Sequence, residues 1–463
     1  MRYGTTAGFT TRAFTRRALG LVTCTIATLM GAVLGYSQEA AKVALPDTTK
    51  CPDVIAEIAT CYTAKHASGA FLLAALPKNW NGNLVVFAHG GPAVVPPTQN
   101  GSQGDLAKYG YAVKLGYAWV ASTYRREGYG VGMAAEDSDN ARRFFIERIG
   151  KPKRTILHGA SYGGLVGAKT IETYAKGAGG TTNYDAGFFN SGIVAGVPQV
   201  HDFRFDLRVV YQYYCKNLPR PDEPQYPLWT GLPADSKMKL ADMQKLIDEC
   251  TGVAKPASAR TDLQKQNLAN ILGVMRFPES MLVRHMQAAT FLFRDIAQGM
   301  TNGRSAFSNT NVAYKGSSND ADLNRNVVRI DADPQALAIL KAEGTPTGQL
   351  PVPVLSIHSI NDPQVAVEVQ TPYREMVHAA GRGDRLVQAY TDENAHTGQS
   401  SAELAASLDS LMQWVEKGVK PTPQSIATRC EQLVKEFEGP CRYRPQYESK
   451  AYATRYARGA AGL

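Results

Sequence analysis

The sequence lacks the patterns that mark a metal centre, a repeat protein or a membrane domain. Its 463 residues include 7 Cys and 8 His, but no Cys-x-x-Cys pair or Cys/His cluster has the spacing of metal ligands. No apolar run beyond residue 36 approaches 18 residues, and there is no internal repeat or low-complexity tract. We therefore expect no metal in the functional site and no membrane span in the body of the chain.

An excess of charge of one sign is also missing from most of the chain. The 50 Lys and Arg residues against 41 Asp and Glu give a net charge of +9, and four of the arginines lie in the first 37 residues with no acid beside them. The remaining +5 is too diffuse to indicate a nucleic-acid partner. A composition that is 44% hydrophobic and 20% charged is that of a globular protein and excludes disorder, collagen and coiled coil.

Residues 1–37 are typical of an export signal. Arg16 and Arg17 precede an uncharged stretch over 19–36, and the stretch ends at small residues before Ser37. The paired arginines resemble a twin-arginine signal, so we expect cleavage near Ser37 and a secreted or periplasmic protein. A membrane anchor is the alternative, but threonines and glycines dilute a segment that is already short for a span. After removal of the signal we expect no stable membrane insertion.

Six cysteines remain after the signal, and they fall as neighbours along the chain. The pairs are Cys51 with Cys61, Cys215 with Cys250, and Cys430 with Cys441. An even number in an exported chain indicates three disulfides, and short loops close most easily, which favours pairing of neighbours among the fifteen possible connectivities. Buried reduced thiols are the alternative.

Short apolar runs alternate with helical stretches along the rest of the chain. The expected strands are 70–76, 84–88, 117–123, 154–157, 186–190, 352–360 and 386–390, and the expected helices are 134–149, 163–176 and 400–417. This alternation demands an open, mostly parallel sheet with helices on its faces. The sequence therefore predicts an α/β fold.

A long insertion interrupts this pattern. The interval from about 200 to 350 has amphipathic stretches at 237–248, 262–272 and 280–296, so it is expected to be a mainly helical cap rather than a loop. Its aromatic residues could line a pocket or form the cap's own core: Tyr211, Tyr213, Tyr214, Tyr226, Trp229, Phe277, Phe291, Phe293 and Phe307. The predicted organisation is a signal (1–37), a core in two parts (38–200 and 351–420), the cap (201–350) and a C-terminal tail (421–463).

A candidate nucleophile follows the fourth expected strand. Residues 159–163 read Gly-Ala-Ser-Tyr-Gly, which matches Gly-x-Ser-x-Gly between a strand and a helix. Such a serine, Ser161, would lie on a sharp turn with its hydroxyl above the sheet, and Gly159, Gly163 and Gly164 would leave room for the neighbouring backbone. The helix N-terminus beneath the hydroxyl favours developing negative charge.

A base and an orienting acid are expected later in the chain, in the order serine, acid, histidine. Asp362 follows the strand at 352–360, and His396 follows the strand at 386–390. Both positions belong to the carboxyl edge of a parallel sheet, where distant segments converge. Asp392 and Glu393 are rival acids, but they lie so close to His396 along the chain that a tight turn would be needed.

An oxyanion-binding loop is expected after the strand at 84–88, where residues 89–92 read His-Gly-Gly-Pro. The expected donors are the N–H groups of Gly91 and of Tyr162, the residue after the nucleophile. We expect His89 to have a structural role, and we expect His158 and His358, which lie in or at the ends of strands, to be core histidines.

Taken together, residues 89–92, residues 159–163, Asp362 and His396 resemble the α/β-hydrolase superfamily over about 70–200 and 351–419. The resemblance implies the α/β-hydrolase fold, Ser161 as nucleophile, His396 as general base and acid, and Asp362 as its orienter. Residues 76–82 resemble those of secreted bacterial esterases. The His-Gly-Gly-Pro loop also looks like that of proline-type aminopeptidases, although Ala93 stands where those peptidases usually carry another glycine.

The sequence thus favours an exported serine hydrolase that cleaves carboxylic esters through an acyl-enzyme. We expect a small-molecule or oligomeric ester as substrate and no metal or organic cofactor. An aminopeptidase with the same triad is the second hypothesis; it would need a carboxylate for the substrate's ammonium group, and Glu223, Glu249 and Glu279 are the candidates in the cap. A catalytically inert binding module is the third hypothesis.

Overall fold

The strands form one mixed sheet in the computed structural model, which describes residues 46–92 and 95–452. The predicted signal lies outside the described residues. The strands are β1 (Asp47–Thr49), β2 (Ala59–Lys65), β3 (Phe71–Pro77), β4 (Asn83–Ala88), β5 (Ala118–Ser122), β6 (Arg154–Ala160), β7 (Ala186–Asn190), β8 (Val354–Ser359) and β9 (Leu386–Thr391). Their order across the sheet is β1-β2-β3-β5-β4-β6-β7-β8-β9.

The pairing directions divide the sheet into two parts. From β1 to β5 the neighbours are antiparallel, and from β5 through β4, β6, β7 and β8 to β9 they are all parallel. The exchange of β4 and β5 in the order, with β3 antiparallel beside them, is the strand arrangement of the α/β-hydrolase fold. The predicted fold class is confirmed.

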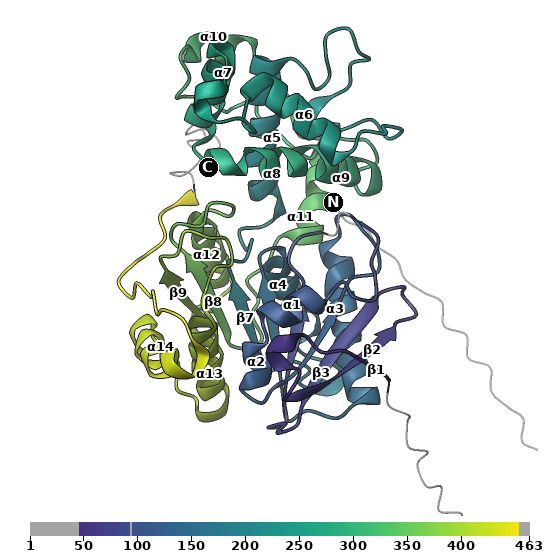
Figure 1. Ribbon diagram of the computed structural model, residues 1–463, viewed down its shortest axis with the longest axis vertical. Coiled ribbons are helices and arrows are strands. Elements are labelled where there is room, and N and C mark those ends of the chain that lie inside the picture. The colour runs from purple at the N-terminus through teal and green to yellow at the C-terminus, as the bar shows by residue number, and fades with distance from the viewer. Residues whose placement is uncertain (1–45, 93–94, 453–463) are drawn as a thin grey trace, which may run out of the picture. The chain divides into compact units, whose positions relative to one another are not determined.

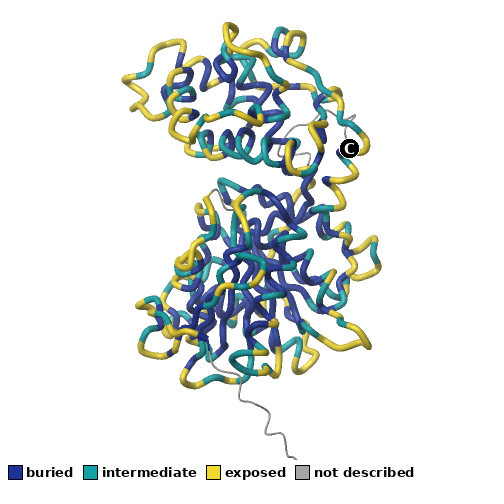
Figure 2. The backbone as a smooth tube through the Cα atoms, turned by 90° about the vertical axis from the view of Figure 1, so that its right-hand side faces the viewer, coloured by how far each residue is buried: buried dark blue, intermediate teal, exposed yellow. Residues whose placement is uncertain are grey.

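Alternate residues of each central strand enter different cores on the two faces of the sheet. In β4, for example, Leu84 and Val86 belong to one buried cluster and Val85 and Phe87 to the other. One face is covered by α3 (Val131–Arg148), α4 (Tyr162–Tyr174) and α12 (Gln370–Ala379), and the other by α1 (Gln103–Lys108), α2 (Tyr111–Lys114), α13 (Ser401–Lys417) and α14 (Pro423–Phe437). Burial on both faces explains the near-continuous apolar runs, which appear as dark blue tube in Figure 2.

Helices occupy the interval between β7 and β8, where the sequence predicts a cap. They are α5 (Val197–Cys215), α6 (Leu240–Thr251), α7 (Asp262–Met275), α8 (Leu282–Gln287), α9 (Phe293–Gly299), α10 (Asp320–Asn326) and α11 (Pro334–Gly344). A π-helical turn over Ala288–Leu292 joins α8 to α9. We refer to α5 to α10 as the cap; α11 packs against α3, α4 and α5 and so connects the cap to the core.

The cysteines are joined in the three neighbouring pairs that the sequence predicts. Cys51–Cys61 closes a loop at the start of the chain's described part, Cys215–Cys250 joins α5 to α6 in the cap, and Cys430–Cys441 fastens the end of the chain to α14. Three disulfides indicate an oxidising compartment. In the range that the structure describes, no helix is both long and apolar enough to cross a bilayer.

Candidate active site

The turn between β6 and α4 holds Ser161 in a strained backbone conformation. Its φ is 56° and its ψ is −122°, which is an unfavourable region for a residue with a side chain. Close packing on every side fixes this turn. A Cβ atom on Gly159 would collide with the carbonyl of Gly163, one on Gly163 with the carbonyl of Ala88, and one on Gly164 with the backbone of Gly192. The glycines are therefore required by the approach of neighbouring backbone, as the motif predicts.

Three segments distant in the sequence bring Ser161, His396 and Asp362 into one hydrogen-bonded chain. His396 Nε2 lies 2.7 Å from Ser161 Oγ, and His396 Nδ1 lies 2.7 Å from Asp362 Oδ2. With Nδ1 donating to the carboxylate, Nε2 of the neutral ring is free to accept the serine proton. Ser161 and Asp362 are buried, with exposed fractions of 9% and 3%.

Asp362 is held as a carboxylate by its surroundings. Burial acts to raise its pKa, but the hydrogen bond and charge of His396, the nearby His358 ring and the Val365 N–H together leave the pKa below its usual value. Its Oδ1 accepts the N–H groups of Gln364 and Val365, each at 2.9 Å. These bonds leave Oδ2 directed at His396.

The rival acids Asp392 and Glu393 have other surroundings. Asp392 forms an ion pair with Arg444. Glu393 is buried, and burial raises its pKa to about 7. Neither carboxylate forms a hydrogen bond with His396 in the described part of the chain, which leaves Asp362 as the acid in contact with the histidine.

The loop at residues 89–92 lies beside Ser161, and its shape is fixed by neighbouring side chains. His89 Nδ1 lies 2.6 Å from Asp105 Oδ2, and the Tyr124 hydroxyl donates to the His89 carbonyl at 2.9 Å. Burial acts to lower the pKa of His89, but the Asp105 carboxylate outweighs it and the pKa is raised. These contacts assign His89 to the support of the loop.

Gly91 and Tyr162 both line the cavity next to Ser161. Gly91 has a φ of +76°, which favours glycine, and no atom lies within 4 Å of where its Cβ would stand. Tyr162 is the first residue of α4, where an N–H has no partner within the helix. Both residues of the expected oxyanion pair therefore border the cavity that Ser161 also lines.

The other histidines singled out by the sequence are part of the core. His158 is enclosed by aromatic rings and lies 2.9 Å from Asn190 Oδ1, and burial lowers its pKa to about 3. His358 Nε2 lies 2.9 Å from the Val365 carbonyl, so it supports the loop that carries Asp362.

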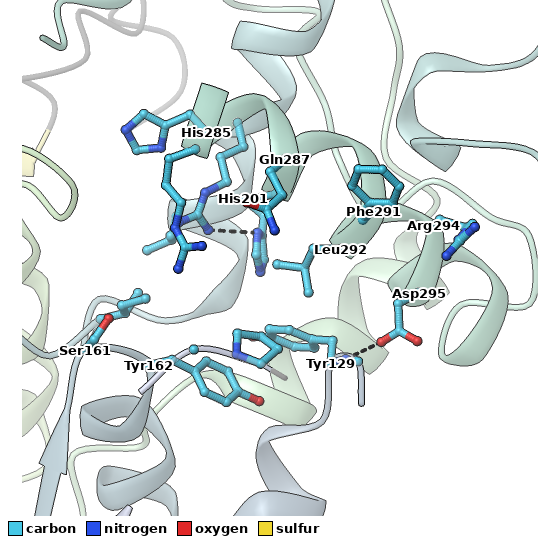
Figure 3. A pocket seen from close by; sticks show the side chains of 18 of the residues that line it. Tyr129, Ser161, Tyr162, His201, His285, Gln287, Phe291, Leu292, Arg294 and Asp295 are labelled. Atoms are coloured by element: carbon cyan, nitrogen blue, oxygen red, sulfur yellow. Dashed lines mark hydrogen bonds between the residues drawn. The ribbon is translucent and has the colours of Figure 1, made fainter. Parts of the chain in front are cut away.

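A cavity of about 500 Å³ opens above Ser161, between the sheet edge and the cap. Figure 3 shows Ser161, Tyr162 and Tyr129 on one side of it and His201, His285 and Gln287 of the cap on the other. The π-helical turn contributes Ala288, Phe291 and Leu292 to the wall. A smaller hollow next to the cavity is lined by residues that include Ser161, His396 and Gly91.

Of the nine cap aromatics named from the sequence, Phe291 lines the cavity. Tyr211, Phe277, Phe293 and Phe307 are buried inside the cap, so the reading of these rings as the cap's own core fits them. The cavity wall instead includes Arg204 and His201 on α5 and Arg284 and His285 on α8. These four residues were not predicted from the sequence. Their only local signal is an arginine near a histidine on a cap helix, three positions after it in α5 and directly before it in α8.

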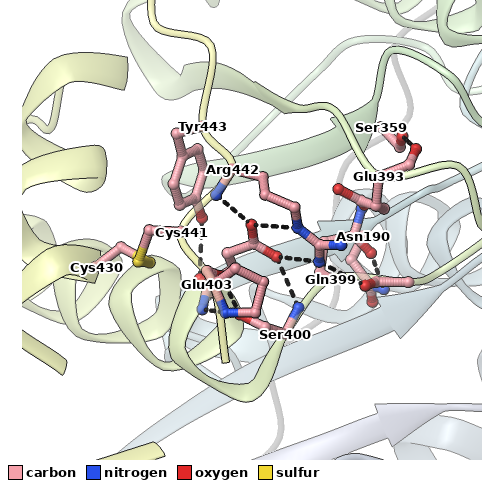
Figure 4. A network of polar contacts seen from close by, with 12 residues as sticks. Asn190, Ser359, Glu393, Gln399, Ser400, Glu403, Cys430, Cys441, Arg442 and Tyr443 are labelled. Carbon is pink, nitrogen blue, oxygen red and sulfur yellow. Dashed lines mark hydrogen bonds and ion pairs between the residues drawn. A yellow bond between two sulfur atoms is a disulfide. The ribbon is translucent and has the colours of Figure 1, made fainter. Parts of the chain in front are cut away.

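The C-terminal tail braces the loop that carries His396 (Figure 4). The Arg442 backbone N–H and guanidinium both donate to the buried Glu403 carboxylate, at 2.7 and 3.0 Å. The same guanidinium donates to the carbonyl of Gly398, two residues after His396, at 2.9 Å. Because Cys441 precedes Arg442 and is bridged to Cys430, the disulfide limits the movement of this brace.

The three glutamates considered as ammonium anchors are engaged elsewhere. Glu249 pairs with Arg220, Glu279 pairs with Arg260, and Glu223 accepts the Arg220 N–H at 2.9 Å. None of the three lines the cavity above Ser161. In the described residues no group of three or more His, Cys, Asp or Glu side chains could hold a metal ion.

The sequence matches no family model and no curated protein. Among solved structures it is similar to feruloyl esterase B from Aspergillus oryzae, with 15% identity over 78% of this chain and 81% of that chain at a TM-score of 0.40. It is also similar to Candida antarctica lipase A (14% identity, 85% and 91% of the chains, TM-score 0.44) and to an esterase from Pyrococcus furiosus (13% identity, 86% and 99%, TM-score 0.37). At these values the likenesses say nothing about the substrate of this chain.

Proposed function

We propose that this protein is an exported serine hydrolase that cleaves carboxylic esters through an acyl-enzyme. The observation that carries the proposal is the chain of two 2.7 Å contacts from Ser161 Oγ to His396 and from His396 to Asp362, at the floor of a cavity large enough for a small ester. Mutual geometry of this kind is what nucleophile, base and orienting acid require.

The proposed reaction has two halves. His396 Nε2 takes the proton of Ser161 as Oγ attacks the ester carbonyl, and it returns this proton to the leaving alcohol as the acyl-enzyme forms. Water then repeats the attack with His396 as base, which releases the acid and restores the serine. Asp362 keeps the imidazole in the tautomer that accepts at Nε2 and stabilises the imidazolium.

Backbone N–H groups would stabilise the negative charge that develops on the carbonyl oxygen. Gly91 and Tyr162 are the proposed donors, since both lie at the cavity beside Ser161. The positive end of the α4 dipole acts in the same direction. The positive φ of Gly91 supports this role, because it lets the loop turn without a side chain between its backbone and the substrate.

An ester substrate is favoured over a peptide because the three glutamates considered as ammonium anchors lie outside the cavity above the nucleophile. An aminopeptidase must hold the α-ammonium of its substrate with a carboxylate close to Ser161, and Glu223, Glu249 and Glu279 do not line the cavity. An inert binding module is disfavoured because the hydrogen bonds from Ser161 to His396 and on to Asp362 are both made.

Export is part of the proposal. The three disulfides support an oxidising compartment, and residues 1–37 read as a signal with a twin-arginine-like pair. N-terminal sequencing of the protein recovered outside the cytoplasm should find a mature chain that begins near Ser37.

The test is a screen of chromogenic esters beside aminoacyl anilides, each with the wild type and Ser161→Ala. We expect short-chain or aryl esters to be cleaved at least about 10²-fold more efficiently, in kcat/KM, than the matching anilides. We also expect the serine variant to lose the activity. A preference for a prolyl or other aminoacyl anilide would make the aminopeptidase hypothesis correct, and ester cleavage unaffected in Ser161→Ala would reject the nucleophile.

A further inference from the structure

The cap side of the cavity carries more positive than negative side chains. The charged residues of its lining are Arg204, Lys239, Arg284 and Arg294 against Glu127 and Asp295. Asp295 already accepts the Tyr129 N–H and lies 3.9 Å from Arg126, so its charge is partly compensated outside the cavity. The wall that faces Ser161 is therefore electropositive before any substrate binds.

Arg284 is the cation best placed to meet a substrate at the nucleophile. It lines both the main cavity and the smaller hollow beside it, and Ser161 lines both as well. Among the residues that the structure describes, its guanidinium has no hydrogen-bond or ion-pair partner. Five N–H donors of a permanent cation thus remain available beside the reacting centre.

Arg204 reaches the same cavity from α5 and is mostly buried, with an exposed fraction of 8%. Its Nη1 lies 3.4 Å from Nδ1 of His201, which faces the cavity beside it. Its positive charge adds to that of Arg284 in the lining of the same cavity.

His285, which lies in the same wall, is neutral and adds no positive charge. Burial lowers the pKa of His285 to about 3, with the charges of Arg204 and Arg284 acting in the same direction. The pKa of His285 also responds to Asp362 and His396, so one ring lies within electrostatic reach of both arginines and of the triad. The two cations and Ser161 therefore border the same cavity.

We propose that Arg284, together with Arg204, binds a carboxylate of the substrate, so that the substrate class is an ester that carries a second, free carboxylate on its acyl or alcohol part. This inference rests on the proposed esterase function. A guanidinium recognises a carboxylate by paired charge-assisted hydrogen bonds. The same charges oppose the ammonium group of an aminopeptidase substrate.

Two matched pairs of chromogenic or aryl esters test the proposal. Mono-p-nitrophenyl adipate against p-nitrophenyl hexanoate places the charge on the acyl part, and 4-acetoxybenzoate against its methyl ester places it on the leaving group. For at least one pair we expect the wild type to favour the charged ester at least about tenfold in kcat/KM. Arg284→Gln should lower that ratio by at least about tenfold, chiefly through KM, since the variant loses a charge-assisted hydrogen bond to the substrate.

Arg276→Gln is the matched control. Arg276 is an exposed cap arginine outside the cavity lining, so its loss removes the same charge from the cap and should leave the ratio unchanged. Arg204→Gln should act like Arg284→Gln; because Arg204 is buried, Arg204→Lys and a circular dichroism spectrum accompany it. The exposed Arg284 keeps the proposal testable if the Arg204 variants do not fold.

A binding measurement separates this inference from the proposed function. Calorimetric titration of Ser161→Ala with adipate, against adipamide, should show binding of adipate alone and its loss in the double variant with Arg284→Gln. Ester cleavage that depends on Ser161 but has equal rates within both pairs would overturn the carboxylate inference and leave the hydrolase intact. Adipate binding at Arg284 without ester cleavage would overturn the proposed function and retain the anion site.

Discussion

The two walls of the cavity are built in different ways. The floor, at the carboxyl edge of the sheet, places Ser161, Asp362 and His396 through backbone geometry: a strained turn, close-packed glycines and loops closed by N–H groups. The cap wall places Arg204 and Arg284 through side chains on helices. Because backbone packing allows little change and side chains on helices can vary residue by residue, we expect the floor to carry the proposed chemistry and the cap to set the choice of substrate.

The sharpest test of the floor is the loss of its nucleophile. Ser161→Ala should fold normally and lower kcat by about 10⁴ or more, because only binding and oxyanion stabilisation remain. Steady-state kinetics on the best chromogenic ester measures the loss, and a thermal melt checks the fold. A variant that retains most of the activity would show that the reaction takes place elsewhere on the molecule.

The acid of the triad can be separated from its neighbours by a matched pair. Asp362→Asn should lower kcat by about 10³ to 10⁴, because an amide no longer accepts the Nδ1 proton and the ring is held in the wrong tautomer. Asp392→Asn removes an equal charge nearby but breaks only the ion pair with Arg444, so it should cost less than about tenfold. The opposite ranking in kcat would transfer the role to Asp392.

Alanine substitution of one glycine in the floor and one in the cap compares how tightly the two regions are packed. Gly163→Ala should lower the free energy of unfolding by about 3 kcal/mol or more, because the new methyl group collides with the Ala88 carbonyl just before the oxyanion loop. Gly303→Ala, in the cap, places a methyl group in open space at a φ of +70° and should cost only about 1 kcal/mol. Urea unfolding of both variants makes the comparison, and similar losses would contradict it.

The same contrast explains what the sequence could predict. The Gly-x-Ser-x-Gly turn and most core strands follow from local signals, which are apolar runs of strand length and flanking glycines. The candidates Asp362 and His396 follow from their places after strands and from the chain order of serine, acid and histidine. β7 occurs as expected at Ala186–Asn190, and β9 differs by one residue at its end. These elements are specified by residues close along the chain.

Other elements were missed because their patterns are not local. β2 has mixed polarity because it lies near the edge of the sheet and pairs antiparallel with β3. Helix α5 is buried on nearly all sides within the cap, so it lacks the polar stripe that reveals an amphipathic helix. Arg204 and Arg284 belong to α5 and α8, and only tertiary packing brings them to one cavity.

The loop that carries His396 offers a pH test at the edge of the floor. Glu393 has a pKa raised by burial to about 7 in the folded protein, against about 4.5 unfolded, so the folded state binds the proton more tightly. Its contribution to stability is complete below about pH 4.5 and is lost as the pH rises through 7, by up to about 3 kcal/mol. Glu393→Gln should flatten this fall in the unfolding free energy between pH 5 and 8, and an unchanged slope would assign it to other groups.

The disulfides provide the finest comparison, since one lies in the cap and one in the tail. Cys215–Cys250 spans 35 residues and Cys430–Cys441 spans 11, so loop-closure entropy predicts stabilisation of about 4 and about 3 kcal/mol, a difference of about 1 kcal/mol. Paired Cys→Ala variants measured by urea unfolding give these values.

The two bridges should also differ in their effects on the kinetic constants, one acting through the cap and the other through the floor. Loss of the cap bridge should change KM more than kcat, because it loosens α5 against α6, whereas loss of the tail bridge should lower kcat severalfold, because Arg442 then holds Gly398 and the His396 loop less firmly. Equal changes of KM and kcat in both variants would mean that the two walls are not independent.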